Sequence, residues 1–286
     1  MANALQLAGT AEAGSGHLAA LLVRAEKIAA SVMLGVHGRK RAGPGENFWQ
    51  YRPYGFGDST QRIDWHASAK SDRVYIRENE WEAANTLWLW VNRGPRMNFK
   101  SKGTQDSKYD RAMVLGLAMA SLALRGHERV GLLGSGERPK LGRSSLGSLA
   151  QSLFLADARP LPPKPSRQRH SAALVVSDFL DDLSDIKAAL LPLASQNMRG
   201  HLVMLADPAE ESLPWSGRVD FRGLDVPASY LANKAESLRA RYADVYAAHV
   251  EAVRQLALSL NFSFTRHRTD ASLAPCLSVL HERLSD

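Results

Sequence analysis

The sequence has little of what marks several common classes of protein. Cys276 is the only cysteine among 286 residues, which excludes an internal disulfide and a cysteine-based zinc cluster and suits a reducing compartment. The longest membrane-like stretch, Ala112–Leu124, falls short of the ~20 residues that a membrane-spanning helix needs. Residues 1–16 have neither the basic start nor the apolar centre of a signal peptide. We therefore expect a soluble, cytoplasmic protein without a membrane span.

Motifs of common enzymes are missing as well. No Gly-x-Gly-x-x-Gly segment joins a strand to a helix, no phosphate-binding P-loop occurs, and the glycine-rich residues 131–136 match neither spacing. The sequence also has no Gly-x-Ser-x-Gly elbow and no histidine pair at zinc-ligand spacing. Asp58, Asp64 and His66 could form a hydrolytic or metal cluster, but an Asp that follows Gly57 in a turn more commonly caps its own backbone. We expect no enzymatic activity.

Positively charged residues are in modest excess. Lys and Arg number 36 against 29 Asp and Glu, for a formal net charge of +7. This charge permits an acidic partner, either a nucleic acid or an acidic protein. The excess is spread along the chain without a run of five or six like charges, which favours a solvated basic surface over a nucleic-acid groove.

A repeating strand and helix pattern fills residues 83–286. The apolar run Thr86–Val91, closed by Gly94-Pro95, predicts a strand buried on both faces. Further strands are expected at 129–134, 172–176, 201–206 and 261–266, with a short edge strand at 139–141, and helices at 105–125, 144–156, 182–196, 230–260 and 272–284. Residues 213–222 have no regular pattern. This alternation predicts a doubly wound α/β domain, a mainly parallel sheet with helices on both faces.

Three further regions precede this domain. We expect a flexible tail over residues 1–16, and a helix and loop over 17–45, because apolar residues recur at helical spacing from 17 to 34. Residues 46–82 are crowded with aromatic side chains and contain strand-like pieces at 48–51 and 74–80, which predicts a small β-rich appendage. Aromatic and arginine side chains interleaved in this way are more often a compact mini-core than a stacking platform for single-stranded nucleic acid.

Polar side chains follow three of the predicted strands. Asn92, Asp178 and Asp207 should lie along the carboxyl edge of one sheet, which is where open α/β sheets bind their ligands. A Mg²⁺ ion would need several oxygen ligands gathered at this edge. The first loop instead supplies two guanidinium groups, Arg93 and Arg96, whose charge would repel a cation.

Parts of the sequence resemble a known family. The segment 45–70 is similar to the signature of the bacterial "domain of unknown function 58" proteins, and residues 177–180 and 207–217 resemble the second half of that family. The residues that carry the signature include Arg52, Tyr54, Gly57, Asp58, Arg62, Asp64 and Trp65. The resemblance implies a von Willebrand factor A-like fold. It also implies a role as adaptor or chaperone partner of a MoxR-type AAA ATPase, since members are commonly encoded beside such ATPases.

The resemblance has a consequence for metal binding. The A-like fold usually carries an Asp-x-Ser-x-Ser metal-ion-dependent adhesion site, whereas Asn92-Arg93-Gly94-Pro95-Arg96 departs from it at all three ligand positions and only Asp178 matches a later acidic position. This implies a degenerate site without a cofactor. We expect Arg96 or Arg93 to stand in place of the cation and pair with Asp178, leaving a basic rim that includes Arg266 and Arg268.

The sequence thus predicts a non-enzymatic protein–protein interaction module. Its expected partner-binding face is the carboxyl end of the sheet, with Asn92, Arg93, Arg96, Asp178 and Asp207. One alternative is ligand binding at the same face that depends on Mg²⁺ or Mn²⁺ at Asp178. Another is nucleic-acid binding through the basic loop Arg39-Lys40-Arg41 and the aromatic appendage.

Overall fold

The computed structural model describes residues 2–36, 48–54, 63–70, 73–79, 86–165, 171–196 and 198–285. The chain divides into two compact units. The smaller unit is Lys40–Ala84, and the larger unit combines Met1–Arg39 with Asn85–Asp286. The helix expected within residues 17–45 therefore belongs to the larger, α/β unit. Along the described part of the chain, no helix combines the length and apolar character needed to cross a membrane.

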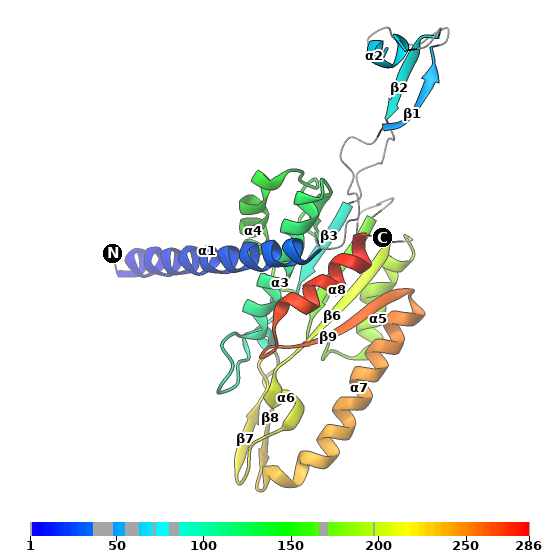
Figure 1. Ribbon diagram of the computed structural model, residues 1–286. Helices are drawn as coiled ribbons and strands as arrows, with labels where there is room; N and C mark the ends of the chain where they lie inside the picture. The colour runs from blue at the N-terminus through cyan, green and yellow to red at the C-terminus, as the bar shows by residue number, and fades with distance from the viewer. Residues whose placement is uncertain are drawn as a thin grey trace. The chain divides into compact units, whose positions relative to one another are not determined.

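A five-stranded parallel sheet forms the centre of the larger unit (Figure 1). Its strands are β3 (Thr86–Val91), β4 (Arg129–Leu132), β5 (Ser171–Ser177), β6 (Arg199–Ala206) and β9 (Phe262–Arg268), in the order β4-β3-β5-β6-β9. This confirms the predicted doubly wound α/β fold, which is consistent with a von Willebrand A-like architecture. The strand order reverses between β3 and β5, and such a switch point is where sheets of this kind bind ligands.

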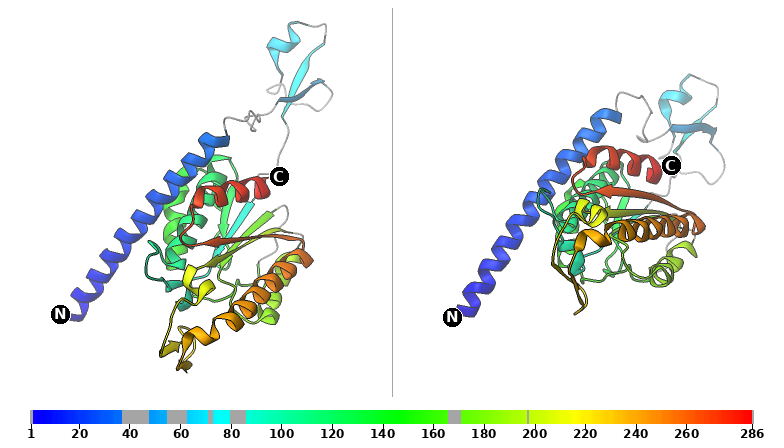
Figure 2. Two further views of the ribbon diagram at one scale, coloured as in Figure 1. Left: turned by 60° about the horizontal axis from the view of Figure 1, so that its bottom comes forward. Right: turned by 90° about the horizontal axis from the view of Figure 1, so that it is seen from below.

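Helices cover both faces of the sheet (Figure 2). Side chains alternate along a strand, so Leu87, Leu89 and Val91 of β3 face one layer while Trp88 and Trp90 face the other. The first layer contains α1 (Ala2–Val36), α3 (Lys108–Arg125), α4 (Leu146–Leu155) and α8 (Leu273–Ser285), and the second contains α5 (Leu183–Ala194) and α7 (Arg239–Ser259). Almost every residue of β3 and α3 is buried, as their apolar sequences predict.

The first helix is longer than the sequence pattern predicts. Residues 2–16, expected to be a flexible tail, form the first turns of α1. Several of these residues are alanine, which has the highest intrinsic helix propensity. Further along α1, Leu21, Ala25 and Ala29 recur at four-residue spacing and are buried in the core that includes α3.

A hairpin near the carboxyl end of the sheet was not predicted. Strand β7 (Val219–Arg222) pairs antiparallel with β8 (Ser229–Ala232) where irregular structure and the start of a long helix were expected (Figure 1). The predicted helix over 230–260 therefore begins only at Arg239. Lys140 forms one antiparallel bridge with Val130 of the edge strand β4. Lys140 lies within the short edge strand predicted at 139–141.

The smaller unit contains the predicted pair of short strands. Strand β1 (Phe48–Pro53) pairs antiparallel with β2 (Tyr75–Asn79), and the short helix α2 (Trp65–Ser68) lies between them in the chain. The Ser68 hydroxyl donates to the Asp64 carbonyl at 2.7 Å and accepts from the Tyr75 amide at 2.9 Å. These bonds attach α2 to the start of β2.

Candidate functional site

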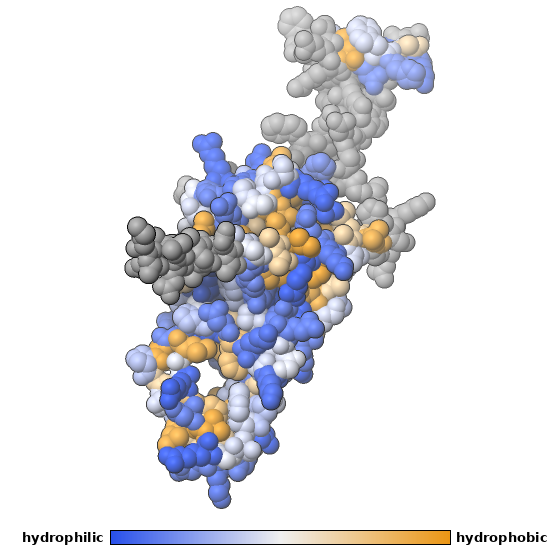
Figure 3. Space-filling model, turned by 90° about the vertical axis from the view of Figure 1, so that its left-hand side faces the viewer, coloured by the Kyte–Doolittle hydropathy of each residue, from blue (hydrophilic) through white to orange (hydrophobic). Residues whose placement is uncertain are grey.

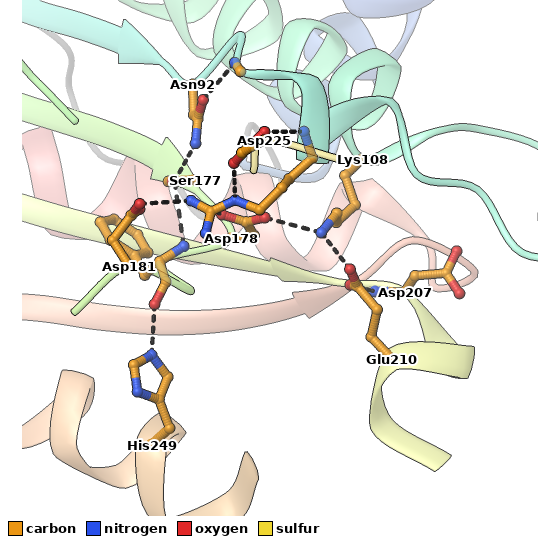
Figure 4. Close-up of polar contacts among 12 residues, drawn as sticks. Asn92, Lys108, Ser177, Asp178, Asp181, Asp207, Glu210, Asp225 and His249 are labelled. Atoms are coloured by element: carbon orange, nitrogen blue, oxygen red, sulfur yellow. Dashed lines mark hydrogen bonds and ion pairs between the residues drawn. The ribbon is translucent and has the colours of Figure 1, made fainter. Parts of the chain in front are cut away.

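The carboxyl edge of the sheet holds a network of polar and charged side chains at the switch point (Figure 4). Asn92 follows β3, and its amide nitrogen Nδ2 donates to Ser177 Oγ at 2.9 Å, at the end of the neighbouring β5. Its Oδ1 accepts from the Gly94 backbone at 2.7 Å. Asn92 is buried, and both ends of its side chain are engaged, so its role is to hold the two strand ends together.

Lys108 is the central cation of this network, and the sequence analysis missed it. It is the first residue of α3, and its Nζ lies 2.9 Å from Asp178 Oδ2 and 2.5 Å from Glu210 Oε1 (Figure 4). The side chains of Lys108 and Asp178 are both 0% exposed. A helix N-terminus disfavours a positive charge, so two carboxylates compensate a lysine that is otherwise poorly placed. The one sequence signal was a lysine in the first turn of an apolar helix that follows β3.

Arg96 is the second cation, and it joins three carboxylates. It lies in the 3₁₀ helix η2 (Pro95–Asn98), and its guanidinium contacts Asp181 at 2.7 Å and Asp225 at 2.5 Å. The predicted pairing with Asp178 is present only at 3.8 Å. The Arg96 backbone amide also donates to Asp225 Oδ1 at 3.0 Å. Arg96 therefore links the tip of the β7–β8 hairpin to the edge of the sheet.

Arg93 and the predicted basic rim do not take the expected positions. The Arg93 guanidinium donates to the Ala156 carbonyl and lies 5.9 Å from the Phe154 ring centroid, at the end of α4, away from Asp178. Arg266 pairs with Glu211 at 2.6 Å, and Arg268 pairs with Asp270 at 2.8 Å. Local acidic partners thus neutralise the two arginines that were expected to form the rim.

Asp207 has a structural role at the end of β6. Its Oδ1 accepts from the Ala209 amide at 2.9 Å, and Glu210 Oε2 accepts from the Asp207 amide at 3.1 Å, which forms a capping box on α6 (Pro208–Ser212). Its Oδ2 accepts from the Ser101 amide at 2.9 Å. Asp207 is fully buried and fixes the loop after η2 against α6.

Burial and charge oppose each other within this network. Burial raises the pKa of the Glu210 carboxyl, although Lys108 acts in the opposite direction. Burial likewise raises the pKa of Asp181, against the effect of Arg96. In both carboxyls the cationic partner thus opposes the effect of burial on the pKa.

The residues present at Asp178 do not fit a divalent metal ion. An ion bound to this carboxylate would lie close to the ammonium of Lys108 and near the guanidinium of Arg96, and both would repel it. The Asn92 amide oxygen, the other expected ligand, already accepts a backbone hydrogen bond. Over the described ranges of the chain, no three His, Cys, Asp or Glu side chains are grouped so that they could hold a metal.

The exposed apolar side chains near this end belong to the hairpin. Asn92, Asp178 and Asp207 are buried, so they cannot contact a partner directly. Large apolar side chains are exposed instead on β8 and the hairpin tip: Leu224, Val226, Tyr230 and Leu231. Figure 3 shows apolar surface on both sides of an opening at the lower end of the α/β unit. Asp225, between two of these apolar residues, is the residue that Arg96 holds.

The residues of the family signature lie in the smaller unit or outside the described residues. Arg52 lies in β1, Tyr54 follows it, and Asp64 and Trp65 lie at the start of α2. Trp65 is 67% exposed and Tyr54 is also exposed, so neither is buried in the expected mini-core. Gly57, Asp58, Arg62 and the basic loop Arg39-Lys40-Arg41 fall outside the described ranges.

Comparisons with known proteins place this arrangement in a family. The model of a family described as "Protein of unknown function DUF58" matches residues 50–252. Uncharacterised proteins of Mycobacterium bovis and Mycobacterium tuberculosis are 23% identical over 226 residues, which cover 72% of this chain and 69% of the relative.

Two solved structures are also similar. One is the conserved hypothetical protein BatB from Bacteroides thetaiotaomicron, at 11% identity and a TM-score of 0.39, over 71% of this chain and 98% of that one. The other is an aerotolerance-related membrane protein from Bacteroides fragilis, at 12% identity and a TM-score of 0.40, over 71% of this chain and 99% of that one.

Proposed function

We propose that this chain, which belongs to the DUF58 family, is a cytoplasmic protein–protein interaction module without enzymatic activity. Its proposed partner is a MoxR-type AAA ATPase, as the family resemblance implies. The proposed contact surface is the carboxyl end of the sheet, and no metal takes part. One observation carries this proposal: the chain's own Lys108 and Arg96 fill the switch point between β3 and β5.

The presence of Lys108 and Arg96 at the switch point argues against the binding of a small substrate there. Ligands of open α/β sheets bind in the crevice outside the strand ends. Here the buried pair of Lys108 and Asp178 lies at this position, and Arg96 bridges from η2 to Asp181. A small ligand would have to displace charges that are already paired and desolvated. Surface recognition by a macromolecule has no such cost.

The hairpin supplies the surface for such recognition. Its exposed Leu224 and Val226 flank Asp225, which Arg96 fixes in place. Exposed apolar side chains held in a defined position are typical of a protein-binding surface. Arg96 would thus act indirectly, by positioning the hairpin, and the buried Asp178 by positioning Arg96 and Lys108.

The test is direct binding between the purified chain and a purified MoxR-type AAA ATPase of the same organism, with and without ATP. We expect Val226→Glu, at a hairpin position 59% exposed, to weaken binding at least about tenfold because it buries a charge in the interface. Val23→Glu on α1, at a position 66% exposed, is the matched control and should leave binding unchanged. Equal binding by both variants would remove the hairpin from the interface, and failure of the wild type to bind in either nucleotide state would reject the partner.

Calorimetric titration with Mg²⁺ and Mn²⁺ separates this proposal from the metal-dependent alternative. We expect no binding heat, because Lys108 already neutralises Asp178. Heat that Asp178→Ala abolishes would instead establish a metal at this carboxylate and reverse the proposal.

A further inference from the structure

A second feature of the α/β unit lies away from the hairpin, at the β4 edge of the sheet. Residues 125–165 contain seven Lys and Arg but only three Asp and Glu, so they carry more than half of the chain's net charge of +7. This segment forms β4, the 3₁₀ helix η3 (Arg143–Ser145), α4 and the connector toward β5. The basic excess is therefore concentrated on one part of the fold.

A cavity of about 430 Å³ lies within this basic region. Its apolar lining comes from Trp88 of β3, from Leu132 and Leu133 at the end of β4, and from Pro139 and Pro165. The charged residues of the lining are Arg138, Lys164 and Glu137, and the Glu137 carboxylate is already paired with Lys140. This volume is in the range of pockets that bind small ligands, and it is large enough for a side chain of a docked peptide.

Close backbone packing shapes the cavity. A Cβ added to Gly131 of β4 would lie 2.6 Å from the Trp88 ring, so glycine is what allows the ring to lie against β4. Gly134, which has a φ of +84°, packs in the same way against Pro163 of the connector. The Trp88 indole nitrogen is buried and has no hydrogen-bond acceptor among the residues described. An unsatisfied buried donor of this kind is unfavourable, and an acceptor that reached it would remove the penalty.

The two cations of the cavity differ from most of their basic neighbours. Arg138 and Lys164 are exposed, and neither has an ion-pair partner within the described part of the chain. By contrast, Lys140 pairs with Glu137 at 3.0 Å and Arg159 pairs with Asp157 at 3.1 Å. Unpaired cations beside an apolar cavity suit a ligand that combines a carboxylate with an apolar group.

We infer that this cavity, together with Arg138 and Lys164, binds an acidic segment of a partner protein. An aliphatic side chain of the segment enters the apolar cavity, and neighbouring carboxylates pair with the two cations. A single-stranded nucleic acid fits less well, because its bases need an exposed aromatic face and the one ring in this lining, Trp88, is only 4% exposed. The inference does not depend on the partner proposed above, since it uses no residue of the hairpin.

A fluorescence anisotropy titration of the full-length chain tests this inference. The probe is a labelled decapeptide that alternates glutamate with leucine. We expect Arg138→Ala combined with Lys164→Ala to weaken binding of this peptide about tenfold, because the double variant loses two partly exposed ion pairs with the glutamates of the peptide. The matched control is Arg129→Ala combined with Arg159→Ala, which removes the same charge from exposed positions of the same region outside the cavity lining. The control should retain wild-type affinity.

Two further arms separate the possible outcomes. A peptide that alternates glutamate with serine should bind at least several-fold more weakly, because it has no group for the apolar cavity. Val226→Glu in the hairpin should bind the leucine peptide normally, so that failure of the AAA partner proposal leaves this result unaffected. If the two double variants weakened peptide binding equally, the binding would depend only on net charge and not on the cavity, and the inference would be overturned. An oligothymidylate that binds more tightly than the peptide would also overturn it.

Discussion

Lys108 is the residue on which the charged network at the carboxyl edge depends. Its ammonium is the direct partner of Asp178 and Glu210, and it is fully buried. Lys108→Met keeps most of the side-chain volume but leaves two desolvated carboxylates without their cation. Removing one partner of a buried ion pair costs about 3–5 kcal/mol, so we expect a loss of that order in the free energy of unfolding measured in urea.

A surface lysine provides the control for this measurement. Lys140→Met removes a cation whose partner, Glu137, is about half exposed, and it should change the free energy of unfolding by less than about 1 kcal/mol. Adding Asp178→Asn and Glu210→Gln to Lys108→Met should recover much of the loss, because the triple variant has no unpaired buried charge. A Lys108→Met protein as stable as the wild type would contradict the central role of this lysine.

Two buried histidines make stability depend on pH. Burial lowers the pKa of His201 and of His267 from 6.5 to about 4. Between these values the unfolded chain binds more protons than the folded protein, so stability present above pH 6.5 is lost as the pH falls toward 4. Each histidine should contribute a loss of about 2 kcal/mol between pH 7 and pH 5.

Urea unfolding at pH 7 and pH 5 measures this loss, and the combined variant His201→Gln and His267→Gln should reduce it. Glu128 acts in the opposite direction: burial raises its pKa to about 7, so its contribution is present below pH 4.5 and is lost as the pH rises through 7. Because Glu128 is common to both proteins, their difference isolates the histidines. An equal pH dependence in the two proteins would show that folding does not lower the pKa values of the two histidines.

At the scale of elements, the β7–β8 hairpin is held at its tip by one arginine. Asp225→Ala removes the carboxylate that accepts a hydrogen bond from the Arg96 backbone and forms an ion pair with its guanidinium, whereas Arg96 keeps its contact with Asp181. We therefore expect thermolysin to cleave the tip near Leu224 about tenfold faster, since local opening exposes loop backbone more readily than global unfolding does. Asp220→Ala, which removes an exposed pair with Arg222 in the same hairpin, should leave the cleavage rate close to that of the wild type. An unchanged rate in Asp225→Ala would show that Arg96 does not hold the tip.

Elements with a strong local signal were the ones that could be predicted from the sequence. Strand β3 and helix α3 were predicted because nearly all of their residues are apolar and buried. The hairpin was not, because Val219–Arg222 alternates apolar and polar residues over only four positions and Ser229–Ala232 does not alternate at all. The pairing of Phe221 with Tyr230 is what makes β7 a strand. Its partners come from the tertiary fold, which local patterns do not show.

The same distinction applies to the candidate site. The positions of Asn92, Asp178 and Asp207 at strand ends follow from the strand pattern, and the structure brings all three to one edge. The pairing of Lys108 spans 70 residues to Asp178 and 102 residues to Glu210. The sequence pattern predicted the correct edge of the sheet and the presence of cations there. Only the three-dimensional structure shows that Lys108, and not Arg96, is the direct partner of Asp178.

At the scale of the whole molecule, the division into two units predicts that the α/β unit folds without the smaller one. The smaller unit, Lys40–Ala84, is compact by itself, whereas α1 is packed into the core of the larger unit through Leu21 and Ala25 and is attached by a two-bond ion pair of Arg24 with Asp106. Replacing residues 40–84 by a flexible glycine and serine linker should therefore retain one cooperative thermal transition within about 3 °C of the wild type, a change of about 1 kcal/mol.

Removal of α1, in contrast to removal of the smaller unit, should destabilise the α/β unit. A chain that begins at residue 40 loses the buried face of α1 and exposes apolar residues of α3, so we expect it to aggregate or to melt at least about 10 °C lower. Binding of the acidic peptide at the β4 edge should persist in the linker variant, because none of the residues proposed for it lies in the smaller unit. If the linker variant lost its cooperative transition, the smaller unit would be part of the folding core, and the division into two units would not hold in solution.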